Sequence, residues 1–194
     1  MKFIGITGGI GAGKSEILKF IKENYKCRIY LADDVAKEVR KPGTKCYDEL
    51  VGLLGKEVAD DSKKMAAALF DNDDLLQKVN GIIHPAVKDY LLAELENAKE
   101  AGDTDLFFVE AALLIECGYK SYVDEMWYVY ASEETRIERL MSSRGYSREK
   151  ALSIIKTQLS EEEFRKGSDF VIDNSGSLED SYKAVREKLG EWQR

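Results

Sequence analysis

The sequence runs KFIGITGGIGAGKS from Lys2 to Ser15, and this stretch determines what the rest of the chain is expected to build. Residues 2–7 are apolar and rich in β-branched side chains, and the glycines that follow interrupt them. They therefore predict a buried strand that ends in a loop. Residues 8–15 fit the pattern G-x-x-x-x-G-K-[ST], and they lie directly after a strand and open an amphipathic helix, which is the context that this pattern requires.

Each residue type in residues 8–15 has a role in binding a polyphosphate. The glycines let successive backbone N–H groups curl around the anion, and the N-terminus of the helix adds positive dipole. Lys14 would reach the β- and γ-phosphates, and Ser15 would ligate Mg²⁺. The alternative is a glycine-rich turn that arose by chance. It does not explain why a strand, a lysine, a hydroxyl residue and a helix all occur where the phosphate-binding pattern requires them. The nucleotide-binding residues expected here are Gly9, Gly11, Ala12, Gly13, Lys14 and Ser15.

The remainder of the chain alternates between the two kinds of apolar pattern. Short apolar runs predict further strands at residues 27–32, 106–109, 126–130 and 170–172. Apolar residues at helical spacing predict helices between them, among them 33–40, 133–143, 147–159 and a C-terminal helix. Between Asp71 and Ala101 we expect two helices that meet at Pro85, because proline disfavours a helix interior. Alternation of this kind predicts an α/β fold with a doubly wound, five-stranded parallel sheet.

Length and composition limit the class of protein. A chain of 194 residues is expected to form one domain. With 29 Lys and Arg against 36 Asp and Glu, the net charge of −7 argues against nucleic acid and anionic membranes as partners, so an anionic ligand must be held by local groups. Three cysteines without C-x-x-C spacing argue against a disulfide framework or a zinc site and favour a cytoplasmic protein. A GTPase would need Asn-Lys-x-Asp, which is absent from the sequence, so a small phosphotransferase is favoured.

Two acidic residues at predicted strand ends are candidates for chemistry. Asp33 follows the second strand, where a carboxylate could orient an acceptor hydroxyl and take its proton. Asp33 or Asp34 could equally be the N-cap of the next helix, because aspartate is favoured there. Glu110 ends the third strand and is a candidate to act near Mg²⁺ through its water shell, the alternative being a solvated acid.

Basic residues in two other segments leave similar alternatives. Guanidinium groups on the helices around residues 133–165 could close over ATP as a lid, or they could form a solvated face paired with glutamates. His84, the only histidine, either contacts substrate or simply ends a helix beside Pro85. The arginines concerned are Arg136, Arg139, Arg144 and Arg148.

Five segments in this order resemble dephospho-coenzyme A kinases along nearly the whole chain. They are Gly5–Ser15, Ala32-Asp33, His84-Pro85, Leu113–Glu116 and Asp169–Asn174. The resemblance implies a P-loop kinase with a helical coenzyme-binding region at about residues 34–100 and a lid at about 133–165. It also implies transfer of the ATP γ-phosphate to the ribose 3′-hydroxyl of dephospho-coenzyme A, with Mg²⁺ as cofactor, in a monomer or weak homo-oligomer. A nucleoside or nucleotide kinase with another acceptor, and a relative that binds without turnover, are the alternatives.

The same resemblance implies roles for individual residues. Asp33 matches the acid that acts as base, and Arg139 matches a recurrent lid arginine. His84 and Lys37 would contact the coenzyme substrate, and Asn174 would lie near adenine. The chain also departs from the family pattern, with Lys37 in place of arginine, Arg136 in place of a frequent glutamine and Ile154 in place of a common arginine; Leu31 and Ala112 are further departures.

Overall fold

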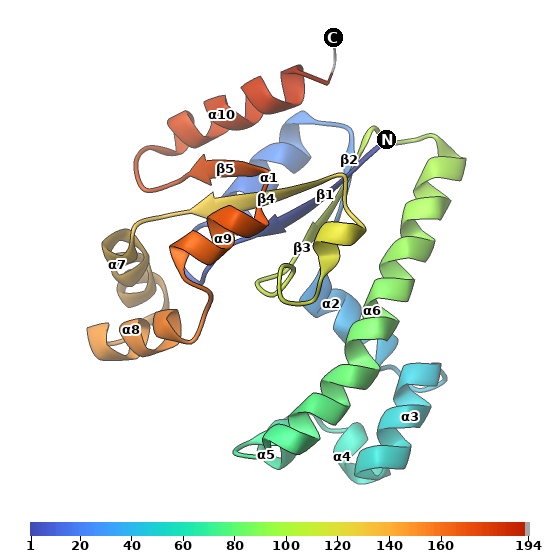
Figure 1. Cartoon of the computed structure of the whole chain (residues 1–194). Helices are drawn as coiled ribbons and strands as arrows, with labels where there is room; N and C mark the ends of the chain where they lie inside the picture. The colour runs from blue at the N-terminus through green and yellow to red at the C-terminus, as the bar shows by residue number, and fades with distance from the viewer. Residues whose placement is uncertain (193–194) are drawn as a thin grey trace. The chain divides into compact units, whose positions relative to one another are not determined.

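The structure is a computed structural model that describes residues 1–192. The chain forms two compact units (Figure 1). The first unit contains residues 1–29 and the chain from Gly102 onward, and it holds most of the sheet. The second unit, Tyr30–Ala101, contains helices joined by short turns, together with the last two residues of the strand that ends at Leu31.

The sheet of the first unit has five strands in the order β2-β3-β1-β4-β5. The pairs β1 with β3, β1 with β4, and β4 with β5 are parallel, which confirms the predicted fold class. β1 lies in the middle, and its residues Phe3–Thr7 are buried because both faces of the sheet are covered. The strands are β1 (Lys2–Thr7), β2 (Cys27–Leu31), β3 (Leu106–Glu110), β4 (Glu125–Tyr130) and β5 (Phe170–Asp173).

Helices α1 and α10 pack against the sheet through one apolar stripe each. Ile17 and Ile21 of α1 and Val185 and Leu189 of α10 lie in the same core cluster as β1 and β4. The helices of this unit are α1 (Lys14–Asn24), α7 (Glu133–Arg144), α8 (Arg148–Lys156), α9 (Glu161–Gly167) and α10 (Leu178–Gly190), with a 3₁₀ turn η1 at Tyr119–Ser121.

The strands of this unit begin and end within one residue of the expected positions, and the larger differences lie in the helices after α7. α8 ends at Lys156, three residues before the expected end, and a separate helix begins at Glu161 with Ser160 as its N-cap. That helix, α9, was not predicted, since its seven residues bury a single side chain, Phe164, and give no periodicity. Its N-terminus nevertheless carries a capping box between Ser160 and Glu163, which is a signal that the sequence contains.

The second unit consists of five helices, and its longest helix corrects a prediction. α6 is continuous from Asp73 to Ala101 with Pro85 inside it, so the expected break at Pro85 is wrong. Proline in a helix interior costs about 3 kcal/mol. Burying Val79 and Val87 on either side of it recovers about 1.5–3 kcal/mol each, so one continuous apolar stripe prevails. The other helices are α2 (Ala32–Val39), α3 (Lys45–Leu54), α4 (Lys56–Ala59) and α5 (Ser62–Leu69), of which α4 and α5 were not predicted.

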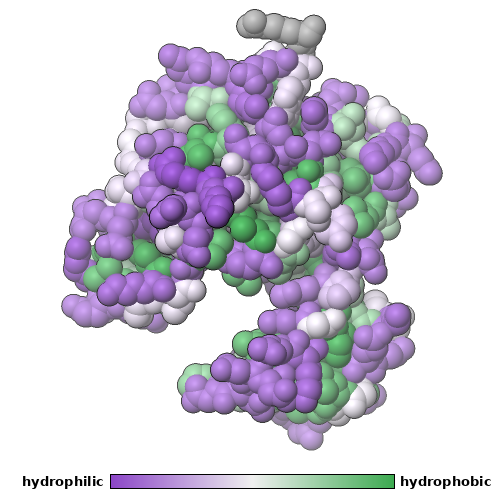
Figure 2. Space-filling view, in the orientation of Figure 1, coloured by the Kyte–Doolittle hydropathy of each residue, from purple (hydrophilic) through white to green (hydrophobic). Residues whose placement is uncertain are grey.

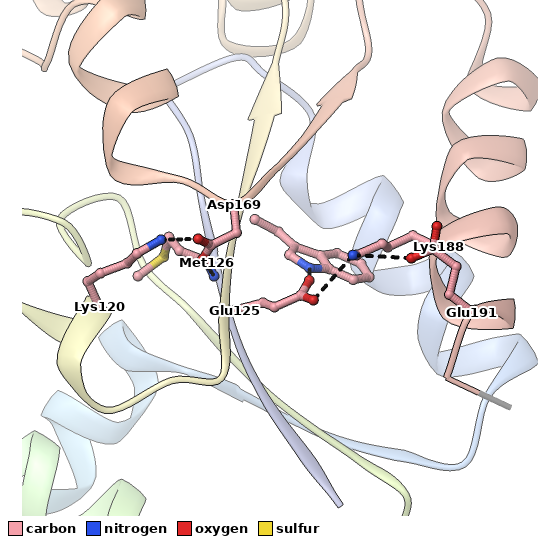
Figure 3. A network of polar contacts seen from close by, with 7 residues as sticks. Lys120, Glu125, Met126, Asp169, Lys188 and Glu191 are labelled. Carbon is pink, nitrogen blue, oxygen red and sulfur yellow. Dashed lines mark hydrogen bonds and ion pairs between the residues drawn. The ribbon is translucent and has the colours of Figure 1, made fainter. Parts of the chain in front are cut away.

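A polar network ties the amino-terminal ends of β4 and β5 to their neighbours (Figure 3). Asp169, just before β5, accepts from the backbone N of Met126 at 2.8 Å and pairs with Lys120. Glu125 accepts from the indole N–H of Trp127 at 2.9 Å and pairs with Lys188 of α10 at 3.2 Å. Because β1, β4 and β5 are parallel, their amino-terminal ends lie on the same side of the sheet. This network is therefore at the opposite end of the strands from the loop that follows β1.

The face shown in Figure 2 is mainly hydrophilic, with hydrophobic side chains in separate small areas. Among the helices described, none is both long enough and apolar enough to span a membrane.

Candidate active site

The glycine-rich loop joins the carboxyl end of the central strand β1 to α1. In open α/β sheets, this edge is where ligands bind. α1 begins after Gly13, and no side chain caps its N-terminus. The first N–H groups of α1 therefore donate no hydrogen bond to a capping side chain, and together with the helix dipole they favour an anion at this end of the helix.

Glycine is required in this loop by close approaches as well as by backbone angles. Gly8 has φ +149°, and a Cβ there would lie 2.4 Å from the carbonyl oxygen of Val129. Gly13 has φ +92°, and its Cβ would lie 2.3 Å from Nδ2 of Asn174. Both positions combine strain with steric overlap, so neither tolerates a side chain.

Side-chain donors hold the carbonyl groups of the loop. Lys14 Nζ donates to the Gly8 oxygen at 2.7 Å, and Arg136 Nε donates to the Ile10 oxygen at 2.8 Å. The Ala12 oxygen accepts from Asn174 Nδ2 at 2.8 Å and from Arg139 Nη1 at 3.2 Å. These bonds fix the peptide planes of the loop without using a ligand.

Lys14 lies beside an acid at the end of β3. Its Nζ is 3.4 Å from Oε1 of Glu110, and both side chains are mostly buried, with 14% and 18% of their surface exposed. Ser15, the next residue along α1, is exposed. The structure therefore places a cation, a carboxylate and a hydroxyl around the same helix start.

The predicted lid arginines have different environments. Arg136 is buried and Arg139 is half-buried, and both contact the loop. Arg148 instead forms two hydrogen bonds of 2.6 Å with Glu134 on an exposed face, as the alternative interpretation of these arginines expects. Arg144 is exposed at the end of α7.

Asn174 supports the loop through a hydrogen bond from its buried side chain. It is 1% exposed, and its Oδ1 accepts from the Ser181 hydroxyl at 3.0 Å while its Nδ2 donates to Ala12. Its carbonyl accepts from Arg139 Nη2 at 2.8 Å. Sequence reasoning did not identify Ser181 or Gln158, because a serine in a helix and a glutamine after one carry no motif of their own.

The helical unit carries the three residues that were expected to meet the coenzyme. Asp33 is the second residue of α2 and is exposed, and the N-cap of α2 is Leu31, with no side-chain cap bond. The interpretation of Asp33 or Asp34 as an N-cap is therefore wrong. Asp34 pairs with Lys37 at 2.7 Å, and this hydrogen bond raises the pKa of Lys37.

His84 is half-buried in the interior of α6. The interpretation of His84 as a residue that merely ends a helix is wrong, because the helix continues for more than four turns beyond it.

Strand order, glycine loop, lysine and uncapped helix together define a P-loop kinase. The family model for dephospho-CoA kinase matches residues 2–180. This chain belongs to the dephospho-CoA kinase family, and it is an ATP-dependent phosphotransferase.

Relatives from several bacteria agree along nearly the full length. The dephospho-CoA kinase of Carboxydothermus hydrogenoformans is 34% identical over 99% of this chain and 95% of its own length. That of Listeria innocua is 36% identical over 95% of this chain and 94% of its own length.

Solved structures agree with the fold. TT1252 from Thermus thermophilus is 31% identical with a TM-score of 0.79, and the match covers 98% of this chain and 97% of that one. The dephospho-CoA kinase from Campylobacter jejuni, at 23% identity, 98% and 96% coverage and a TM-score of 0.69, shows the shared fold.

Proposed function

We propose that this protein transfers the γ-phosphate of ATP to the ribose 3′-hydroxyl of dephospho-coenzyme A. The observation that carries the proposal is the uncapped start of α1, with Lys14 beside it, in a chain that matches this family from residue 2 to residue 180. An anion site of this kind suits a polyphosphate, and family membership supplies the acceptor.

In this proposal the loop binds the triphosphate. The backbone N–H groups of Gly9, Gly11, Ala12 and Gly13 surround the phosphates, and Lys14 contacts the β- and γ-phosphates. Arg139, already placed against the loop, adds charge that stabilises the transferring phosphoryl group. Asn174 lies in the segment after β5 that this proposal places near adenine, and its own polar groups hold Ala12, Arg139 and Ser181 in place.

The residues at the loop fit Mg²⁺. Ser15 offers a hydroxyl to the ion itself, and Glu110 offers a carboxylate that would accept hydrogen bonds from the waters bound to the ion. Mg²⁺ keeps several waters and is held by one or two protein groups together with substrate phosphates, so it does not need a preformed cage. Among residues 1–192, no group of three or more His, Cys, Asp or Glu side chains could hold a metal ion, which fits this mode of binding. Bound Mg²⁺ would neutralise charge on the phosphates.

The helical unit supplies the acceptor side in this proposal. Asp33 acts as the general base, and the absence of a capping bond leaves its exposed carboxylate available for that role. His84 and Lys37 contact the coenzyme. The region of about residues 34–100 binds dephospho-coenzyme A, and the segment of about 133–165 acts as a lid.

The experiment compares Asp33→Asn with Asp34→Asn. Asparagine keeps the size of aspartate but cannot take a proton, so Asp33→Asn should keep ATP binding and lose roughly 10²-fold or more in turnover with dephospho-coenzyme A. Asp34→Asn removes only an exposed pair with Lys37, which solvent screens, and should change turnover by less than about tenfold.

Turnover is measured as ADP release with dephospho-coenzyme A and with a panel of nucleosides and nucleotides as acceptors. An active Asp33→Asn enzyme would remove the base assignment. A higher specificity for another acceptor would replace the proposed substrate, and ATP binding without turnover on any acceptor would indicate a non-catalytic relative.

A further inference from the structure

Ile10, in the middle of the phosphate loop, has both of its backbone polar groups held by side chains from distant segments. Its N–H donates to Oε1 of Gln158 at 2.9 Å, and its carbonyl accepts from Nε of Arg136 at 2.8 Å. Arg136 comes from α7, and Gln158 lies between α8 and α9. The peptide groups before and after Ile10 are therefore both held by side chains from the segment that follows β4.

The two side chains also bind each other. Nη2 of Arg136 donates to Oε1 of Gln158 at 2.7 Å, so this amide oxygen accepts two bonds and uses both lone pairs. Gly9 permits the arrangement, because a Cβ there would lie 2.2 Å from Nη2 of Arg136. Arg136, Gln158 and Ile10 therefore form a closed triangle of hydrogen bonds against a glycine.

Arg136 is an unusual choice if its role is only structural. Its side chain is buried, with 8% of the residue exposed, and within residues 1–192 no carboxylate forms a salt bridge with it. Burial lowers the pKa of this guanidinium, although arginine remains charged in proteins. Its hydrogen bonds go to neutral acceptors and the charge of Glu133 offsets the effect of burial only in part, so Arg136 is costly for folding, and an anion bound at the loop would compensate this cost.

We propose that Arg136 and Gln158 are positioning residues that clamp the two peptide groups of Ile10 and so hold the phosphate loop ready for the triphosphate. A loop fixed before its ligand arrives loses less conformational freedom on binding, and affinity rises accordingly. Because the clamp joins the loop to α7 and to the end of α8, ATP binding and the order of that segment are linked, and each favours the other. This inference rests on the proposed binding of ATP.

Direct ATP binding tests the clamp without the acceptor. Isothermal titration of ATP with Mg²⁺ should show about tenfold weaker binding for Gln158→Leu, which leaves the charge unchanged, and for Arg136→Met. The double variant should bind little worse than either single variant, because both side chains act through the same residue. Arg136→Lys should remain weak, since an ammonium cannot donate to Ile10 and Gln158 with the geometry of a guanidinium fork.

Arg148→Met is the matched control. Arg148 belongs to the same segment and also joins α7 to α8, but it does so through two hydrogen bonds to Glu134 on an exposed face. Its loss should leave ATP affinity within about twofold, and melting without nucleotide monitors the fold of every variant. If Arg136→Met does not fold, Gln158→Leu decides.

Several results would overturn the clamp. Wild-type affinity in Gln158→Leu would remove the role of that amide, and wild-type affinity in Arg136→Lys would assign the effect to charge alone. If Arg148→Met lost as much ATP affinity as the clamp variants, any loosening of the segment would weaken binding. If the affinity loss of the double variant were the product of the two single losses, Arg136 and Gln158 would act independently. A wild-type protein that does not bind ATP would instead refute the proposed function.

Discussion

Gly13→Ala tests whether the loop geometry is as tight as the structure shows. Gly13 has φ +92°, and an alanine Cβ would lie 2.3 Å from Nδ2 of Asn174. Positive φ costs a residue with a side chain about 1–2 kcal/mol. Asn174 is 1% exposed and would lose its bond to Ala12, worth about 1 kcal/mol, and repacking around the extra methyl group adds about 1–3 kcal/mol. We expect the free energy of unfolding to fall by about 3–6 kcal/mol.

Urea denaturation followed by far-ultraviolet circular dichroism measures this loss. Gly190→Ala is the matched control in the same unit, because Gly190 ends α10 and, within residues 1–192, its Cβ would meet no atom of another segment within 4 Å. Alanine is a better helix former than glycine, so this control should be neutral or should stabilise the protein by up to about 1 kcal/mol. A Gly13→Ala protein as stable as the wild type would refute the close approach of Asn174 to the loop.

Three further changes probe other parts of the chain. Lys14→Ala should lower kcat/KM by roughly 10²-fold or more with little change in the circular dichroism spectrum, because its charge acts on phosphate; near-normal ADP release from the folded variant would contradict the ATP site. Arg139→Ala should lower kcat by a larger factor than it raises KM for ATP, and steady-state kinetics that show only a raised KM would assign this arginine to ground-state binding. Pro85→Ala should raise the free energy of unfolding by up to about 3 kcal/mol in urea melts, since it restores a donor inside α6, and unchanged stability would show that the helix already compensates for the missing bond.

The sheet and the loop could be predicted because their signals are local. Continuous apolar runs reveal strands covered on both faces, and β1 begins and ends at the predicted residues. Pro85 misled the prediction because a local rule about proline competed with packing along the whole of α6, which the sequence does not show directly.

The same distinction separates the site residues. Lys14 and Ser15 belong to a contiguous motif, whereas the contacts of Arg136 and Gln158 with Ile10 join residues 126 and 148 positions apart. Asn174 was expected near adenine, but the direction of its side chain depends on a contact with Ala12, 162 positions away. Contacts of this range follow only from the assembled sheet.

A protein with a net charge of −7 has to hold ATP with local groups, and the loop shows how such groups can be kept ready. Lys14 and Arg139 are held by the carbonyl oxygens of Gly8 and Ala12, which are neutral acceptors. Hydrogen bonds to an ionised phosphate are roughly twice as strong as those to neutral groups, so in the proposed complex both cations can exchange a carbonyl for phosphate with a net gain. Had carboxylates held both cations, each exchange would have to break an ion pair first. Lys14 does have one such ion pair, since its Nζ lies 3.4 Å from Oε1 of Glu110, and binding phosphate would weaken that pair. Mg²⁺ arriving with ATP would offer the Glu110 carboxylate a new partner.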